Sequence, residues 1–85
     1  MNNNKELTNS FSIKQQLIIN YIDVGIKILK EQRYTKSLKE NILREMNVSK
    51  SMIQSSQTEG DLESGLFVYR LLTKYLEDNH YRLLL

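Results

Sequence analysis

Three capping patterns restrict where helices can begin in this chain, and the most informative one lies in the stretch from Tyr34 to Leu62. Ser37 is followed three residues later by Glu40. In this pairing the hydroxyl and the carboxylate each accept a hydrogen bond from the other residue's free backbone N–H. The pairing predicts a helix that begins at Leu38. Its apolar residues recur every three or four positions, which places them on one face that must be buried; they are Leu38, Ile42, Leu43 and Met46.

A turn is expected directly after this helix. Asn47 tolerates the left-handed conformation that ends many helices better than any residue except glycine. Val48 can then turn inward, and Ser49 can cap a further short helix from Lys50 to about Gln57. The stretch therefore predicts a helix-turn-helix.

The N-terminal part of the chain predicts an arm and a first helix. Residues 1–11 are polar and lack an apolar period, so we expect a flexible arm. Ser12 and Gln15 repeat the capping pattern and start a helix that continues to about Gln32. Gly25 inside this helix costs about 1 kcal/mol relative to alanine, and both a close helix crossing and simple tolerance explain it. The apolar positions predict a largely buried helix; they are Leu17, Ile18, Ile19, Tyr21, Ile22, Ile26, Ile28 and Leu29.

The C-terminal part predicts a longer fourth helix. Thr58 and Asp61 repeat the cap spacing once more, and the helix that they start should end near Glu77. Residues 12–57 then form a three-helix core, and residues 58–85 form the fourth helix with an apolar tail. Three interpretations of the tail stay open: it packs back on the domain, it self-associates, or it is the cut edge of a longer protein. The fold class is an all-α bundle of about four helices.

Composition supports this class and excludes several functions. The chain has 85 residues, which form one small domain, and its lack of cysteine excludes disulfides and thiolate metal sites. It has no proline and three glycines, which suits helices with short connections. No apolar run reaches the roughly 20 residues of a membrane span, and without an apolar signal core we expect a cytoplasmic protein. One histidine and no glycine-rich phosphate loop predict neither an enzyme nor a metal or cofactor site.

The charge is unevenly distributed. From Lys27 to Lys50 seven basic residues stand against three acidic ones, and beyond Gln57 acidic residues predominate. The basic part coincides with the predicted helix-turn-helix, as a footprint for phosphate groups would. A solvated surface of mixed charge explains the same pattern.

The residue pattern described above resembles that of the DNA-binding domain of TetR-family repressors over roughly half of the chain. The resemblance is carried by Ile22, Ile26 and Leu29 in the first helix, Arg33 and Tyr34 at its end, Ser37 and Leu38 at the cap, residues 42–50 with Ile53, and residues 58–62. It implies a tri-helical helix-turn-helix that reads DNA. The chain departs from the family where Gln54, Ser55 and Ser56 replace the usual aromatic cluster of the recognition helix. It also lacks the family's ligand-binding domain, so a ligand-responsive repressor is not predicted.

The first functional hypothesis is therefore a small DNA-binding transcriptional regulator that acts as a dimer on double-stranded DNA. Base contacts are expected from side chains suited to the major groove: Lys50, Ser51, Gln54 and Ser55. Backbone contacts are expected from nearby basic residues: Arg33, Lys36, Lys39 and Arg44. A homodimer or helical partner is expected along the C-terminal helix and tail, through Leu66, Tyr69, Leu76, Tyr81 and Leu83.

The second hypothesis is a helical protein-interaction module, such as an antirepressor or an adaptor, that keeps the fold without DNA binding. The missing aromatic residues, the weak net charge of +2 and the apolar C-terminus favour it. The two hypotheses differ in whether the outward side chains of residues 49–56 project from a positively charged face.

Overall fold

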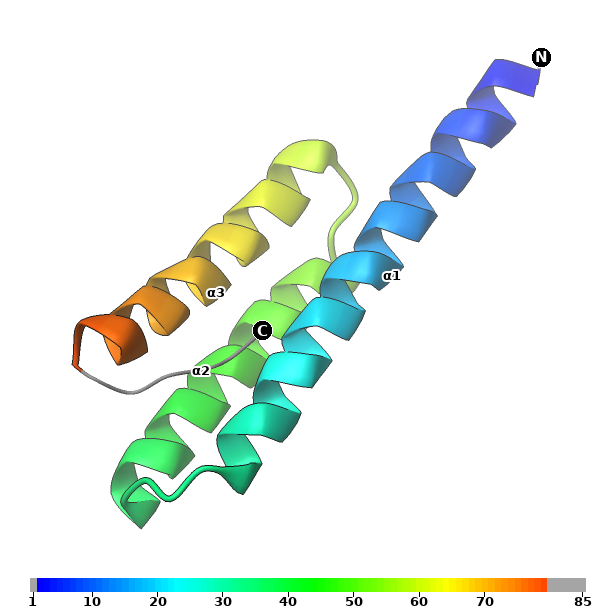
Figure 1. Cartoon of the computed structure of the whole chain (residues 1–85). Coiled ribbons are helices and arrows are strands. Elements are labelled where there is room, and N and C mark those ends of the chain that lie inside the picture. The colour runs from blue at the N-terminus through cyan, green and yellow to red at the C-terminus, as the bar shows by residue number, and fades with distance from the viewer. Residues whose placement is uncertain (1, 80–85) are drawn as a thin grey trace.

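The computed structural model describes the backbone of residues 2–79 and the side chains of residues 10–79. It contains three helices in this part of the chain: α1 (Asn2–Glu31), α2 (Lys36–Gln54) and α3 (Glu59–Asp78). Short connections join them, so α2 runs back along α1 and α3 runs back along α2 (Figure 1). The N-terminal part of α1 extends beyond the other two helices (Figure 1). None of the described helices combines the length and the apolar character needed to cross a membrane.

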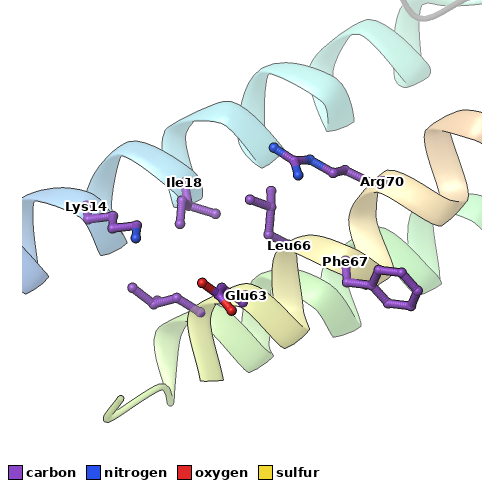
Figure 2. A pocket seen from close by; sticks show the side chains of 7 residues that line it. Lys14, Ile18, Glu63, Leu66, Phe67 and Arg70 are labelled. Carbon is purple, nitrogen blue, oxygen red and sulfur yellow. The ribbon is translucent and has the colours of Figure 1, made fainter. Parts of the chain in front are cut away.

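Helix α2 is the central element of the packing. It packs extensively against both α1 and α3, whereas α1 and α3 touch each other only at a few positions. The core that they enclose consists of Ile22, Ile26, Leu29, Ile42, Met46, Ile53, Leu62, Tyr69 and Leu76. Because α3 packs mainly against α2, a groove remains between α1 and α3 (Figure 2).

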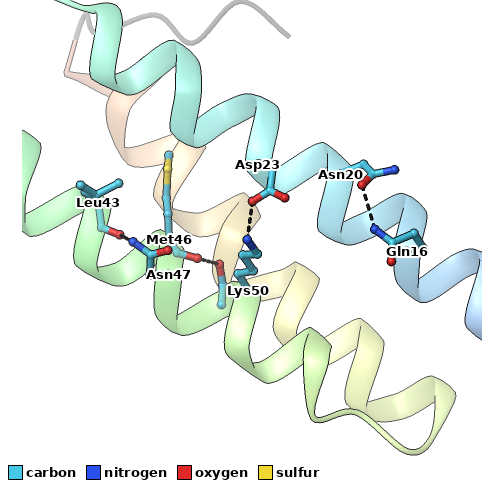
Figure 3. Close-up of polar contacts among 8 residues, drawn as sticks. Gln16, Asn20, Asp23, Leu43, Met46, Asn47 and Lys50 are labelled. Carbon is cyan, nitrogen blue, oxygen red and sulfur yellow. Dashed lines mark hydrogen bonds and ion pairs between the residues drawn. The ribbon is translucent and has the colours of Figure 1, made fainter.

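The structure has three helices where the sequence predicted about four, because α2 continues through the expected turn at residues 47–49. The Asn47 side chain donates to the carbonyl oxygen of Leu43 at 3.0 Å, and the Ser49 hydroxyl donates to that of Met46 at 2.8 Å (Figure 3). These are bonds to the preceding helical turn, so neither residue caps a new helix. Val48 was expected to turn inward, but it is 47% exposed.

The physical reason for the continuous helix is the spacing of the residues on its buried face. Ile42, Met46, Ser49 and Ile53 are all buried in α2 and follow one another at three- or four-residue intervals. One unbroken helix can therefore bury all four, and the segment contains neither glycine nor proline to interrupt it. Residues 12–57 accordingly hold the later part of α1 and the whole of α2 rather than three helices.

Two of the predicted helix starts are displaced. Thr35, not Ser37, caps α2: its hydroxyl accepts from the Leu38 N–H at 3.3 Å. Ser12 caps nothing, because α1 already begins at Asn2. Most of residues 1–11 are thus helical, and their flexibility stays a prediction.

The predicted start of the last helix is confirmed. Asp61 N–H donates to the Thr58 hydroxyl at 3.1 Å, and the Asp61 carboxylate accepts from the N–H of Thr58 at 3.2 Å and of Gln57 at 3.0 Å. These hydrogen bonds, that from Gln57 first, lower the pKa of Asp61. The last helix ends at Asp78, one residue beyond the predicted end.

A close crossing accounts for Gly25. This glycine lies under the ring and hydroxyl of Tyr69 of α3, and a methyl group in its place would overlap that hydroxyl. Tyr69 is fully buried there and meets Tyr21 edge to face, with 5.2 Å between ring centroids. The close approach of α3 to α1 at this point therefore needs a residue without a side chain.

Candidate functional site

The four residues predicted to contact bases do not share one free surface. Lys50 Nζ lies 2.7 Å from the Asp23 carboxylate of α1, and its side chain is 27% exposed (Figure 3). Ser51, Gln54 and Ser55 are exposed at the C-terminal end of α2. The Ser55 hydroxyl bonds back to the carbonyl oxygen of Ser51 at 3.0 Å. Lys50 thus links α2 to α1 through an ion pair, whereas the other three predicted base-contact residues are exposed at the end of α2.

The four residues predicted to contact the DNA backbone are spread along the molecule. Arg33 is exposed between α1 and α2. Lys36 lies 3.9 Å from Glu40, and Lys39 Nζ donates to the carbonyl oxygen of Lys30 at 2.8 Å. Lys36 and Lys39 lie near the start of α2, about 28 Å and about 24 Å from Ser55 at 1.5 Å per residue.

Only Arg44 of this set lies near the predicted base contacts. It donates to Asn41 at 3.1 Å and lines a shallow surface hollow with Ser51 and Ser55. The structure therefore brings one backbone-contact residue together with two base-contact residues, and it places the others apart.

The predicted partner surface on α3 is largely internal. Tyr69 and Leu76 are fully buried in the core, so these two residues are not available to a partner. Leu66 is half-buried, and Tyr81 and Leu83 lie outside the described residues. The reason is the direction of packing: the face of α3 that carries Leu62, Tyr69 and Leu76 is the one that turns toward α2 and α1.

A different apolar surface is exposed, and none of its residues was among those predicted to contact a partner. On α1, Leu17 is 62% exposed although this helix was expected to be largely buried. On α3, Phe67 is 61% exposed. Further exposed apolar side chains follow at helical spacing on each helix: Ile13, Tyr21 and Val24 on α1, and Leu71 and Tyr75 on α3. The available signal was that apolar residues occupy more of each helix than one packed face needs.

Three of these exposed side chains, Leu17 and Tyr21 on α1 and Phe67 on α3, border the groove between α1 and α3, which we call the α1–α3 groove. Its lining comes from both helices: Lys14 and Ile18 of α1, and Leu62, Glu63, Leu66, Phe67 and Arg70 of α3 (Figure 2). A second hollow continues it along α1 past Leu17 and Tyr21. The floor is apolar, and the charged side chains stand around it.

The charges around the groove are unequally paired. Lys14 Nζ lies 2.6 Å from the Glu59 carboxylate, and this hydrogen bond, with the charges of Glu59 and Glu63, raises the pKa of Lys14. Within the described part of the chain, neither Glu63 nor Arg70 takes part in an ion pair. Among the residues that the structure describes, the groove therefore offers one carboxylate and one guanidinium outside any ion pair, beside an apolar floor.

A polar contact fixes the position of α1 beside this groove. The Gln15 side-chain amide donates to the carbonyl oxygens of Ile53 at 2.8 Å and Gln54 at 3.3 Å. Carbonyls in the last turn of a helix lack the usual N–H four residues on, so Gln15 adds a donor to two of them at the end of α2. The Ile53 carbonyl also accepts from the Ser56 N–H at 3.1 Å. The Gln15 contact, with the Lys14–Glu59 pair, holds the N-terminal half of α1 against both neighbours.

Comparison of the chain with protein-family models, curated proteins and solved structures finds no match. The resemblance to TetR-family repressors consequently rests on the residues alone and stays a prediction. Within the described residues, no group of three or more histidine and acidic side chains is placed to hold a metal ion. The α1–α3 groove is the feature that the structure adds.

Proposed function

We propose that this chain is a non-enzymatic helical module that binds a protein through the α1–α3 groove. The observation that carries the proposal is the exposure of large apolar side chains on both walls, with Leu17 62% and Phe67 61% exposed. A contiguous apolar surface with a polar rim is typical of protein–protein interfaces. An antirepressor or an adaptor is a protein of this class.

The shape of the groove favours a helical partner. An amphipathic helix can lay its apolar face between two helices, and it then contacts residues three and four positions apart on each. Here the half-buried Ile18 and Leu66 form the floor, and Phe67 stands at the edge. A helix bound there would be the fourth member of the bundle, on the side of α1 and α3 that α2 leaves uncovered.

The arrangement of the basic residues is less favourable to DNA as the partner. Lys50 is paired with Asp23, and Lys36 and Lys39 lie at the far end of α2 from the exposed Ser51 and Ser55. Direct readout needs the base-contacting side chains to project together into one groove, with cations beside them on the phosphates. A protein partner does not need such a cluster of cations, so this objection does not apply to a protein bound in the α1–α3 groove.

Substitution of the two groove walls tests the proposal. Proteins retained by the immobilised full chain would be identified, purified and titrated calorimetrically with the wild type, Leu17→Ser and Phe67→Ser. Large apolar residues at the centre of an interface typically contribute 2 kcal/mol or more, so we expect each substitution to weaken binding at least about 10-fold. Val48→Ser is the matched control, because Val48 is 47% exposed on α2 and does not line the groove. Equal affinity of all four chains would contradict the proposal.

Binding of double-stranded DNA is the second candidate function, favoured by the exposure of Arg33, Lys36 and Arg44 and of the polar side chains at the end of α2. For this function a mobility shift on genomic fragments is expected at low salt. Its affinity should fall steeply as salt rises, because bound cations are released from the phosphates. Arg44→Ala should weaken binding, whereas Phe67→Ser should weaken it only if dimerisation is required. No shift at low salt would eliminate this function.

A further inference from the structure

Over residues 59–74 the outward face of α3 has its charges separated by sign, and two further exposed acidic residues, Glu77 and Asp78, follow at the end of the helix. Glu59 and Glu63 precede Leu66 and Phe67, and two basic residues, Arg70 and Lys74, follow. Apart from the adjacent Leu66 and Phe67, the intervals along this series are three or four residues, so all six side chains lie along one side of the helix. All are exposed except Leu66, which is half-buried in the α1–α3 groove.

The order of these charges has a symmetry. Glu63 and Arg70 lie at equal distances on either side of the point midway between Leu66 and Phe67, and Glu59 and Lys74 do the same. A second α3 that crosses this point in the opposite direction would therefore place each acidic residue against a basic one. A parallel copy would place like charges against each other.

Interactions within α3 do not account for the positions of Glu63 and Arg70. Glu59 with Glu63, and Arg70 with Lys74, are like-charge pairs at the four-residue spacing, which destabilises an isolated helix. The helix dipole favours acids in the first turn and bases in the last, and its influence is lost beyond those turns. Glu63 and Arg70 lie outside them, and the last turn of α3 carries no basic residue.

Contacts within the described chain do not account for it either. Glu59 is paired with Lys14 of α1, but neither Glu63, Arg70 nor Lys74 is in an ion pair among the described residues. The central charges thus flank an exposed aromatic residue and take part in no ion pair within the described part of the chain. An interface with the opposite charge order would neutralise both at once.

We propose that the occupant of the α1–α3 groove is a second copy of this chain, with the two α3 helices antiparallel about a twofold axis that passes between Leu66 and Phe67. This inference rests on the proposed function and names its partner. Glu63 of each copy faces Arg70 of the other, and Phe67 of each copy packs on Leu66 of the other. An interface of this kind is self-complementary, as twofold symmetry requires. Leu17 and Tyr21 of α1 line the hollow beside it and extend the apolar contact.

Charge reversal in the full chain tests the pairing. Sedimentation over a concentration series should show self-association of the wild type. In the Glu63→Arg variant, the new arginine of each copy would face Arg70 of the other copy, on both sides of the twofold axis. In the Arg70→Glu variant, the new glutamate of each copy would face Glu63 of the other copy in the same way. Like charges opposed across an interface are strongly unfavourable, so each single variant should self-associate at least about 10-fold more weakly.

Recombining the charges gives the decisive result. A mixture of Glu63→Arg with Arg70→Glu restores both opposite-charge contacts and should form a heterodimer, and the double variant E63R/R70E should self-associate like the wild type. Both residues are exposed, so circular dichroism should show that every variant stays folded. A monomeric wild type, or single variants that self-associate like the wild type, would overturn the pairing.

The outcome for the pairing is distinguishable from that for the proposed function. A monomeric wild type that still binds an identified protein, with affinity lost in Phe67→Ser, would overturn self-association and leave the interaction function in place. If Phe67→Ser weakens neither self-association nor partner binding, both the α3 pairing and the proposed function are overturned.

Discussion

Replacement of Tyr69 by alanine should lower the free energy of unfolding by about 3–5 kcal/mol, the range for large aromatic residues removed from a core. Tyr69 is fully buried between α1 and α3, and it meets Tyr21 edge to face with an interplanar angle of 69°. Its loss leaves a cavity where α3 makes one of its few approaches to α1. Urea denaturation followed by circular dichroism measures the change. A loss under about 1 kcal/mol would contradict the burial of Tyr69.

Tyr69→Phe is the matched control, and it should have little effect. The Tyr69 hydroxyl is buried and has no hydrogen-bond partner among the described residues. Burial, with a smaller contribution from Tyr21, raises the pKa of Tyr69 to about 12, so the group stays neutral near pH 7. Removal of an unpaired buried hydroxyl costs no hydrogen bond, and we expect a change from zero to a gain of about 1 kcal/mol. A clear loss of stability would instead reveal a partner for the hydroxyl.

Replacement of Val48 by proline should cost about 3 kcal/mol or more. Val48 lies inside the continuous helix α2, where proline removes a backbone hydrogen bond and clashes with the carbonyl four residues earlier. In a domain of this size each kcal/mol lowers the melting temperature by about 4–8 °C. Thermal unfolding measures this decrease directly. A turn at residues 47–49 would hold Val48 outside the helical hydrogen bonds, so a small effect would favour the helix-turn-helix over the continuous helix.

Val48→Ala separates the two geometries by side-chain burial rather than by the backbone. The side chain is 47% exposed, and alanine is the better helix former, so stability should change by less than about 0.5 kcal/mol. A valine turned into the core of a helix-turn-helix would lose two buried methyl groups, at a cost of roughly 1.5 kcal/mol. The pair of substitutions therefore tests both the backbone and the side chain at the point where the predicted and observed folds differ.

The last helix illustrates what could be predicted from local sequence. Thr58 and Asp61 are three residues apart, and their reciprocal hydrogen bonds need only the backbone between them. Such a cap forms whatever the rest of the molecule does.

Asn47 and Ser49 illustrate where local sequence was insufficient. Each has a polar side chain that can cap a new helix or bond back to the preceding turn of the same helix. The sequence pattern favoured the first use, and the structure shows the second. The choice depends on burial: α2 lies between α1 and α3, and a single straight helix exposes neither Met46 nor Ile53.

The sequence by itself determined that the chain is all-helical, where its last helix begins, and which of its residues are apolar. Only the tertiary structure decided which of those residues are buried. Helix α1 has apolar side chains around much of its circumference, and its contacts with α2 bury Ile22 and Leu29 while leaving Leu17 in solvent. Helical periodicity places residues on faces, but it does not say which face meets a neighbour. That assignment depends on how the three helices pack, and it created the α1–α3 groove.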